Sequence, residues 1–362
     1  MRISIIIPCF NEAETIEAVV ERVFAAQLPP GWSKEIIIVD DGSGVATRDA
    51  LARIRDAGNP VVIHMREQNG GKGAAVKDGL RRATGDYVLI QDADLEYDPN
   101  EYQRLLQPLV ERPEVSVFGT RAHAQNTVSY SRIYFYGGLL VTRLYNLLFN
   151  KSLTDIASCY KVFSARHIPA LLKSSHDDFV FDAIDLTHTL ISSGPVEEVP
   201  ISYVARSKKT GKKLNWSHGL DIVLAMILAR IGVPIERRAS AARILRFIIS
   251  GGCAAVVNII LLYLLTEFAG MWYMISAGLA FVAAFLVSFF LQKYWAFRNV
   301  AAAGARIQMS QHLVSAVVNL GLNLILIYTL VEYVGLWYIL AQIISSALIA
   351  FESFFAFRWI YR

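Results

Sequence analysis

A group of carboxylates directly follows a short apolar run in the stretch Gly85-Asp-Tyr-Val-Leu-Ile-Gln-Asp-Ala-Asp-Leu-Glu-Tyr-Asp-Pro99. The run Tyr87–Ile90 is bounded by a turn signal, which predicts a buried parallel strand that ends where the acids begin. Ligands of an open α/β sheet bind at the carboxyl ends of its strands, and two carboxylates one residue apart there can share a hard divalent cation. About one Asp-x-Asp pair is expected by chance in such a chain, so the residues around Asp92 and Asp94 must decide whether this pair is a metal site.

Strand and helix patterns alternate through the first half of the chain. Apolar runs predict strands at 3–7, 35–39, 61–65, 87–90 and 114–118, and periodic segments predict helices at 11–26 and 72–83. Glu14 follows Asn11 by three residues, which predicts a capping box at the first helix. The repeating order predicts an α/β domain with a doubly wound, mostly parallel sheet. The turn after the first strand lacks the Gly-x-Gly-x-x-Gly pattern of dinucleotide-binding folds.

The second half of the chain has the composition of a membrane domain. The 362 residues suffice for about two domains, and 54% of them are hydrophobic. Long stretches almost free of charge predict an all-α domain of four transmembrane spans near 247–266, 271–292, 312–331 and 336–357. The N-terminal apolar run is short and broken by Pro8, so we expect no cleaved targeting segment. Cys9, Cys159 and Cys253 lie far apart in sequence, which suits a reducing compartment and argues against zinc.

The predicted membrane domain, 247–362, is an internal repeat. Glu267-Phe-Ala-Gly-Met-Trp-Tyr recurs as Glu332-Tyr-Val-Gly-Leu-Trp-Tyr, so two helical hairpins are expected to form one unit. Basic residues between the second and third spans and in the linker 231–246 place these segments and the N-terminal domain in the cytoplasm. Asn258 and Asn323 fall inside spans, where an amide serves either helix association or a transport site.

Two apolar helices are predicted near 132–149 and 215–230, and both are too short to cross a bilayer. One interpretation is that they cover the sheet like ordinary helices. The other is that they lie in the membrane interface and seat the soluble domain, 1–230, on lipid.

Polar turns follow the first two predicted strands. Pro8, Asn11 and Glu12 lie in the first turn, and Asp40 and Asp41 lie in the second. Each turn alone could be purely structural, but together they are predicted to form one wall of the crevice at the strand ends.

A glycine-rich turn, Asn69-Gly-Gly-Lys-Gly-Ala74, leads into the helix that begins near Lys72. Its backbone N–H groups and the Lys72 ammonium could meet a phosphate, although the Walker pattern is absent. A set of cations lies downstream: Arg121, Arg132, Arg206, Lys212 and Lys213.

In their order and spacing these segments resemble the family 2 glycosyltransferases of GT-A fold, and within them the polyprenyl-phosphate sugar synthases typified by dolichyl-phosphate mannose and glucose synthases. The resemblance covers roughly residues 1–230, and the remainder is similar to the GtrA-type membrane domain often fused to such enzymes. The matching segments are Pro-Cys-Phe-Asn-Glu at 8–12, Glu-Ile-Ile-Ile-Val-Asp-Asp-Gly-Ser at 35–43, Gly-Gly-Lys-Gly-Ala-Ala at 70–75, Gln-Asp-Ala-Asp-Leu-Glu-Tyr-Asp-Pro at 91–99, Phe-Gly-Thr-Arg at 118–121 and Glu-Val-Pro-Ile-Ser-Tyr at 198–203.

The resemblance implies a metal-dependent hexosyltransferase whose donor is a nucleotide diphosphate sugar of the UDP-glucose or GDP-mannose class. The implied donor-binding residues are Pro8, Asn11, Glu12, Asp40, Asp41, Lys72 and Asp92. Asp92, Asp94 and Glu96 would hold Mg²⁺ or Mn²⁺ against the pyrophosphate of the donor.

The implied acceptor is the phosphate of a polyprenyl phosphate. This group is largely anionic at neutral pH, so it needs no strong general base, and the sugar carbon would be inverted. Two anionic substrates need a binding site with positively charged residues, and the resemblance implies Arg121, Arg132, Arg206 and Lys213 for this role. The implied catalytic residues are Asp92, Asp94, Arg121 and Asp182.

The sequence departs from the family pattern at two places. Asp182 matches the first acid of a pair on its helix, but Ile184 stands at the second position with Asp185 beside it, so Asp182 could simply cap the helix. Ala157 stands where relatives often carry a polar residue, which leaves the choice of sugar open.

The sequence thus predicts a multi-pass protein of a prokaryotic plasma membrane, with a cytoplasmic catalytic domain and no nucleic-acid partner. A homo-oligomer is left open. The alternatives are a polysaccharide synthase, whose Gln-x-x-Arg-Trp motif is absent, and a lipid-linked sugar translocase or scaffold with an inactive transferase domain.

Overall fold

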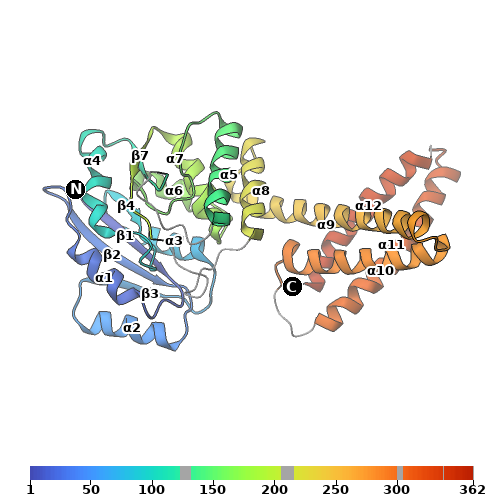
Figure 1. Cartoon of the computed structure of the whole chain (residues 1–362), viewed down its shortest axis with the longest axis horizontal. Helices are drawn as coiled ribbons and strands as arrows, with labels where there is room; N and C mark the ends of the chain where they lie inside the picture. The colour runs from blue at the N-terminus through green and yellow to red at the C-terminus, as the bar shows by residue number, and fades with distance from the viewer. Residues whose placement is uncertain (123–131, 205–215, 300–304, 337, 362) are drawn as a thin grey trace. The chain divides into compact units, whose positions relative to one another are not determined.

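The chain consists of two compact units, Met1–Ala239 and Ser240–Arg362. The computed structural model describes residues 1–122, 132–204, 216–299, 305–336 and 338–361 (Figure 1). The boundary between the units falls within the predicted basic linker, whose last part belongs to helix α9 (Arg238–Tyr263).

The first unit is built on a seven-stranded sheet of order β3-β2-β1-β4-β6-β5-β7. Its strands are β1 (Arg2–Cys9), β2 (Ser33–Asp40), β3 (Val61–Met65), β4 (Tyr87–Ile90), β5 (Ser116–Thr120), β6 (Lys161–Ser164) and β7 (Val196–Pro200). Among the strands of the described residues, β6 alone runs antiparallel to its neighbours, β4 and β5. The prediction of a doubly wound, mostly parallel sheet is therefore confirmed.

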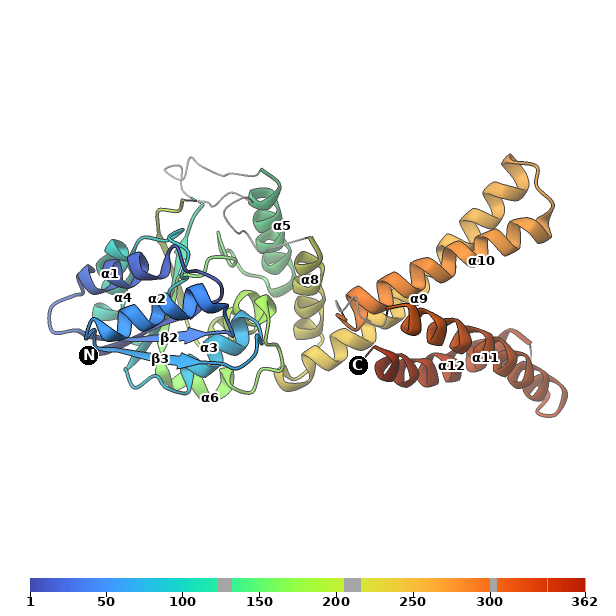
Figure 2. The same ribbon diagram turned by 90° about the horizontal axis from the view of Figure 1, so that it is seen from below.

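Helices cover both faces of this sheet because its central strands are apolar on both sides. Ile5 and Ile7 of β1 pack against α1 (Ile16–Ala25), α2 (Val45–Asp56) and α4 (Tyr102–Glu111). Ile6, which points the other way, packs with α3 (Lys72–Leu80), α5 (Arg132–Phe149), α7 (Thr187–Ser193) and α8 (Trp216–Arg230). Figure 2 shows α1, α2 and α4 on one side of the strands, with α3 and α6 (Ile168–Leu171) on the other.

The start of the first helix was predicted wrongly. Helix α1 begins at Ile16, and its N-cap, Thr15, makes no side-chain capping bond. Asn11 instead has a positive φ of 54° and accepts a hydrogen bond from the Gly44 backbone N–H at 2.9 Å through Oδ1. A long-range contact to the turn after β2 therefore replaces the local capping box.

Helices α5 and α8 have one face in the core and one face exposed. Tyr145 of α5 and Met226 of α8 belong to the same buried cluster, so one face of each helix packs on the domain, as the first interpretation expects. Seating of these helices in the membrane interface, the second interpretation, stays a prediction. On the other face of α5, Tyr136, Leu140 and Leu147 are largely exposed.

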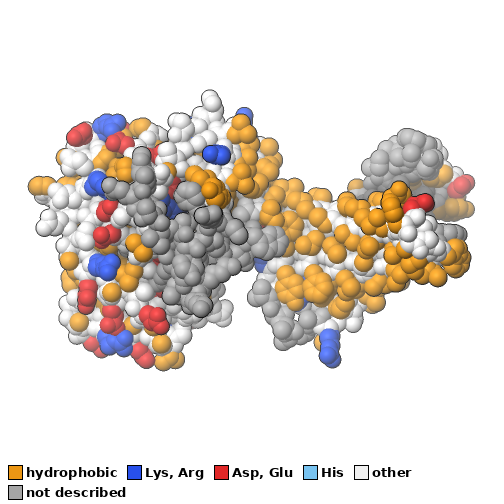
Figure 3. All heavy atoms as spheres, viewed as in Figure 1, with side chains coloured by type: hydrophobic (Ala, Val, Ile, Leu, Met, Phe, Trp, Pro, Cys, Tyr) orange, Lys and Arg blue, Asp and Glu red, His pale blue; other side chains and the backbone are white. Residues whose placement is uncertain are grey.

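The second unit is helical in its described part. It contains most of α9, α10 (Tyr273–Phe290), α11 (Ala305–Glu332) and α12 (Tyr338–Ile360), with π-helical turns at Leu264–Phe268 and Leu291–Ala296. Within the described residues, two segments are long and apolar enough to cross a membrane, Ile235–Phe268 and Leu279–Ala296. Figure 3 shows hydrophobic side chains along the drawn surface of these helices. The prediction of four spans stays a prediction.

Candidate active site

The predicted site residues gather where β1, β2 and β4 end. Cys9 pairs with Asp40 at the last register position of β1 and β2, and Ile6 pairs with Ile90 at the end of β4. Thr15 Oγ1 donates to the Ala93 carbonyl at 2.7 Å and to Glu12 Oε2 at 3.1 Å. The turn after β1 is thereby joined to the acidic turn after β4.

Hydrogen bonds join the two polar turns that were predicted to form one wall. The Asn11 backbone N–H donates to Ser43 Oγ at 2.9 Å, while the Ser43 N–H lies 3.3 Å from both carboxylate oxygens of Asp40. Asp40 is fully buried, and Pro8 is paired within the sheet with Val39. Asp40 and Asn11 therefore shape this wall by holding backbone.

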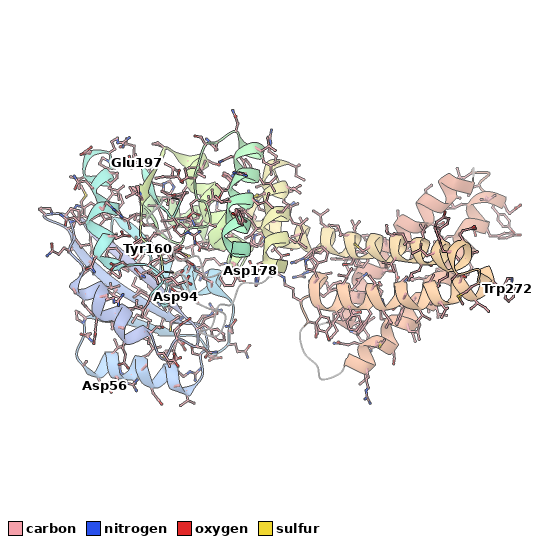
Figure 4. The ribbon with its side chains drawn as sticks, in the orientation of Figure 1. Asp56, Asp94, Tyr160, Asp178, Glu197 and Trp272 are labelled. Atoms are coloured by element: carbon pink, nitrogen blue, oxygen red, sulfur yellow. The ribbon has the colours of Figure 1, made fainter. Side chains whose placement is uncertain are left out.

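The acidic turn is held by a buried glutamine. Gln91 Oε1 accepts hydrogen bonds from the hydroxyls of Tyr102 and Tyr160, both at 2.7 Å, and its Nε2 donates to the Asp92 carbonyl at 2.9 Å. Leu95 has a positive φ of 61°, which is rare for a branched residue and marks a turn that its surroundings must hold in place. Asp94, labelled with Tyr160 in Figure 4, accepts the Glu96 backbone N–H at 3.1 Å.

Lys72 lies between two carboxylates. Its Nζ is 2.7 Å from Asp92 Oδ1, 3.0 Å from Asp182 Oδ2 and 3.0 Å from Cys159 Sγ. Lys161 approaches the other oxygen of Asp182 at 3.6 Å. Burial opposes the positive charge, but Asp182 and Asp92 outweigh it and hold the pKa of Lys72 well above its usual value.

Asp182 contacts two lysines, which favours a place in the site over the alternative that it simply caps its helix. The π-helical segment Phe181–Leu186 is preceded by a bond from the Val180 N–H to Asp178 Oδ1, whereas Asp182 faces the lysines. Burial acts to raise the pKa of Asp182, but Lys161 and Lys72 lower it below the usual carboxyl range.

Asp185 has a different environment from Asp182. Its carboxylate accepts bonds from Ser174 Oγ at 2.5 Å and Arg238 Nη1 at 2.9 Å, and lies 2.8 Å from His176 Nδ1. Asp185 therefore ties the π-helical segment to the start of α9.

The glycine-rich turn is bound to Asp41. The backbone N–H groups of Gly70 and Gly71 donate to the two Asp41 oxygens at 2.9 and 2.8 Å. Binding of a phosphate by this turn stays a prediction. Burial raises the pKa of Asp41 despite these bonds. A Cβ on Gly73 would lie 2.6 Å from Phe181 Cβ and 2.8 Å from the Asp178 carbonyl oxygen, so the turn packs tightly against the segment that carries Asp182.

Arg121 is held by a second set of contacts. Asp155 accepts from Arg121 Nε at 2.7 Å and from Nη2 at 2.9 Å. The guanidinium carbon lies 4.9 Å from the ring centre of Tyr203, whose hydroxyl donates to Glu96 Oε2 at 2.8 Å. Burial opposes the charge, but Arg121 lowers the pKa of Asp155 below its usual value. Tyr203 thus connects a candidate metal ligand, Glu96, with a candidate acceptor-binding residue.

The rest of the predicted cationic set is only partly described. Arg132 is the first residue of α5, but its side chain lies outside the described part of the structure. Arg206 and Lys213 also lie outside the described residues.

The acidic turn offers a donor set for a divalent cation. Asp92 and Asp94 supply hard carboxylate oxygens, and Mg²⁺ commonly takes one or two carboxylates together with phosphate oxygens and water. No group of three or more His, Cys, Asp and Glu side chains within the described residues could hold a metal ion by itself. The residues present therefore fit a cation that is shared with a phosphorylated ligand.

Four residues of this site were missed in the sequence: Gln91, Cys159, Lys161 and Tyr203. Gln91 and Tyr203 lie inside segments that were matched to the family pattern, but no role was assigned to them. The position of Gln91, a polar residue directly after an apolar strand, is a signal that could have indicated its role. Cys159 and Lys161 reach the site from the antiparallel strand β6 and the residues before it, and no local pattern indicates that pairing.

Residues 4–172 match glycosyl transferase family 2, and residues 246–361 match the GtrA/DPMS transmembrane domain. A relative in Serratia proteamaculans (strain 568), an undecaprenyl-phosphate 4-deoxy-4-formamido-L-arabinose transferase, is 31% identical over 185 residues, which are 50% of this chain and 54% of the relative. The enzyme of the same name in Enterobacter sp. (strain 638) is 28% identical over 206 residues, 57% of this chain and 60% of the relative. The chain thus spans little more than half the length of these relatives.

Among solved structures, glucosyl-3-phosphoglycerate synthase from Mycobacterium tuberculosis, in complex with Mn²⁺, uridine diphosphate and phosphoglyceric acid, is 21% identical in sequence. The similarity covers 64% of this chain and 79% of that one, with a TM-score of 0.46.

Proposed function

Because the chain combines a glycosyl transferase family 2 domain with a GtrA/DPMS transmembrane domain, as its motifs predicted, we propose that it transfers a hexose from a nucleotide diphosphate sugar to the phosphate of a polyprenyl phosphate. The observation that carries the proposal is the convergence of Asp92, Lys72 and Asp182 at the end of β4, in a domain joined to membrane helices. The sugar donors of the UDP-glucose and GDP-mannose classes both fit this chemistry.

The donor side is formed by the turns after β1, β2 and β4. In the proposed complex, Pro8 and Glu12 flank the base and ribose, while Asn11, Asp40 and Asp41 act by holding the backbone of this wall and of the glycine-rich turn. Asp92 and Asp94, with Glu96 nearby, would hold Mg²⁺ or Mn²⁺. A bound metal would neutralise charge on the pyrophosphate as the nucleoside diphosphate leaves.

Lys72 is positioned to contact the same pyrophosphate. Its ammonium contacts Asp92, and a pyrophosphate that reaches this carboxylate with its cation would also reach Lys72. Asp182 keeps the ammonium in place from the other side at 3.0 Å.

The acceptor side requires little proton transfer. A phosphate monoester has a second pKa of about 6, so it is a competent nucleophile at neutral pH and attack in line with the leaving group inverts the sugar carbon. Arg121, held in place by Asp155 and Tyr203, would orient the acceptor phosphate, with Arg132, Arg206 and Lys213 as the further cations of the proposal.

The transmembrane domain and two apolar helical segments make the chain a membrane protein. We further propose a multi-pass arrangement with the catalytic domain in the cytoplasm at a prokaryotic plasma membrane. The exposed apolar side chains of α5, including Tyr136 and Leu140, support seating of that domain on lipid.

The proposal is tested by Asp94→Ala and by chelation of divalent metal. Each should abolish transfer of labelled sugar to polyprenyl phosphate while the protein remains folded in membranes. Asp56→Ala, at the exposed end of α2 and away from Asp94 in Figure 4, is the matched control and should keep full activity. Full activity of Asp94→Ala would refute the metal assignment.

The acceptor assignment is tested separately with Arg121. Arg121→Ala should raise the KM for polyprenyl phosphate far more than the KM for the nucleotide sugar, and Arg121→Lys should recover only part of the loss because lysine lacks the planar fork. A larger effect on the donor KM would refute the assignment.

A further inference from the structure

Glu198 of β7 is the first residue of the matched segment 198–203, and the proposed reaction does not explain its presence. Its two carboxylate oxygens accept the Thr154 backbone N–H at 2.9 and 2.8 Å. Oε1 also accepts from the Asp155 backbone N–H and from Thr154 Oγ1, both at 3.0 Å. Three donors of the loop between α5 and β6 therefore converge on one carboxylate, which holds this loop against the sheet.

The loop that Glu198 holds carries Asp155, which in turn holds Arg121. Asp155 Oδ2 accepts from the Arg121 backbone N–H at 3.1 Å and from Nε at 2.7 Å, and Oδ1 accepts from Nη2 at 2.9 Å. An aspartate side chain is short and has few rotamers, so the place of its backbone decides where its carboxylate lies. A shift of the loop would therefore shift the guanidinium of Arg121.

A chain of hydroxyl groups joins Glu198 to the backbone on both sides of Arg121. Thr154 Oγ1 donates its proton to the Glu198 carboxylate, which can only accept. Thr120 Oγ1 lies 2.6 Å from Thr154 Oγ1, so the Thr120 hydroxyl is the donor of that pair. Thr120 Oγ1 in turn accepts from the Ala122 backbone N–H at 3.3 Å. Glu198 is thus connected to the residues directly before and after Arg121.

The far end of the same segment contacts Arg121 directly. The Ile201 backbone N–H donates to the Thr120 carbonyl at 3.0 Å, which continues the pairing of β7 with β5. The Tyr203 ring centre then lies 4.9 Å from the guanidinium carbon of Arg121. The segment therefore holds Arg121 twice, through the loop bound to Glu198 and through the ring of Tyr203.

We propose that Glu198 is a positioning residue that fixes Arg121 for the acceptor phosphate, through Asp155 and through the hydroxyls of Thr154 and Thr120. The inference rests on the proposed function, because it takes Arg121 as the residue that binds this phosphate. A guanidinium binds a phosphate through two parallel N–H bonds, and this geometry is lost when the group is displaced. Glu198 acts through Arg121 and is not itself a catalytic residue.

The first test measures transfer of labelled sugar by the full-length protein. Glu198→Gln keeps the size of the side chain, but its NH2 group cannot accept from the loop. The KM for polyprenyl phosphate should rise about fivefold, which is within the range of couplings in one hydrogen-bond network, and the KM for the nucleotide sugar should stay the same. Glu197→Gln is the matched control, because the neighbouring Glu197 points to the other face of β7 and pairs with the exposed Arg112. It should change neither KM.

A double mutant distinguishes positioning from a general weakening of the domain. In an Arg121→Ala background, Glu198→Gln should raise the acceptor KM no further, because the residue through which it acts is gone. The same rise in both backgrounds would overturn the proposal. Thr154→Val provides the measurement if Glu198→Gln fails to fold, since it removes the hydroxyl and keeps the backbone bonds to Glu198. It should raise the acceptor KM about twofold, and Thr154→Ser should recover most of that loss.

Hydrogen exchange of the full-length protein in detergent tests the same contacts without a transfer assay. Because the Arg121 N–H donates to Asp155, peptides that contain Arg121 should exchange about tenfold faster in Glu198→Gln, and Glu197→Gln should match wild type. Unchanged exchange in Glu198→Gln, or an unchanged acceptor KM in a Glu198→Gln protein that transfers sugar, would overturn the proposal. Absence of transfer by wild type would refute the proposed function, whereas the exchange rates would still decide whether Glu198 holds Arg121.

Discussion

Replacing Lys72 by methionine removes the positive charge between Asp92 and Asp182. The two carboxylates are 2.7 and 3.0 Å from the ammonium, and Lys161, 3.6 Å from Asp182, is the lysine of the described residues that remains beside them. Breaking a buried ion pair by removing one partner costs about 3 kcal/mol, because the remaining charge is left unpaired. In a unit of this size we expect the unfolding midpoint to fall by about 10 °C.

Lys77→Met provides the matched control for this prediction. Lys77 lies on the same helix and is equally buried, but its partner Asp177 is largely exposed, with Nζ to Oδ1 at 2.5 Å. Lys77 Nζ also donates to the Ser174 carbonyl at 3.1 Å, and losing this bond together with the contact to a solvated carboxylate costs about 2 kcal/mol or less. Both variants retain a side chain of similar length, so the difference between them reports the charge balance of the site.

Adding Mg²⁺ or Mn²⁺ extends the comparison to the metal assignment. If Asp92 is a metal ligand, the cation replaces the missing ammonium and should stabilise Lys72→Met more than wild type, where Lys72 competes for the same oxygen. A metal present at 100 times its Kd stabilises by about 2.7 kcal/mol. Equal stability of Lys72→Met and Lys77→Met, with no difference in their response to metal, would refute the reasoning.

Three further predictions concern the packing and the charges of the site. Gly73→Ala should destabilise by about 2 kcal/mol because its Cβ would overlap Phe181 and the Asp178 backbone, whereas Gly137→Ala, with open space around its Cβ, should be neutral or stabilising in a urea titration. Tyr203→Phe should lower the free energy of unfolding by about 1.5 kcal/mol because its hydrogen bond to Glu96 is lost. Tyr203→Leu should lower it by about 1 kcal/mol more because the ring over Arg121 is lost as well. Equal losses in the two variants would contradict the contact between the ring and Arg121. Folding lowers the pKa values of the Asp155 and Asp182 carboxyls, so the stabilisation they provide is complete above the unfolded pKa of about 4. It should be lost as the pH falls through the lower folded values. Asp155→Asn should diminish this loss in a pH series of unfolding midpoints.

The sheet could be predicted because its signals are local. Val61–Met65 and Tyr87–Ile90 were predicted with the bounds that the structure shows, since each is an apolar run closed by polar residues. The helix after β1 was misplaced for the opposite reason. Asn11 bonds to Gly44, more than thirty residues away, and this contact displaces the capping box that its neighbours suggest.

The candidate site was predicted at its strand ends but not in its internal contacts. The acids after β4 and the turns after β1 and β2 meet because parallel strands end at one edge of the sheet. Its internal contacts depend on how segments distant in sequence pack together. Asp41 accepts from the Gly70 and Gly71 N–H groups, and Lys72 contacts Asp182. Such pairings carry no periodic signal in the sequence, so only the structure shows that the glycine-rich turn binds a carboxylate of its own chain.

The most direct test of the proposed function incubates washed membranes that contain the protein with polyprenyl phosphate and a panel of labelled nucleotide sugars, and measures lipid-soluble label. We predict that wild type labels the lipid from one class of nucleotide sugar in a metal-dependent reaction, and that Asp94→Ala membranes with equal protein give none. Labelling from no sugar of the panel would contradict the account and favour a translocase or scaffold with an inactive transferase domain.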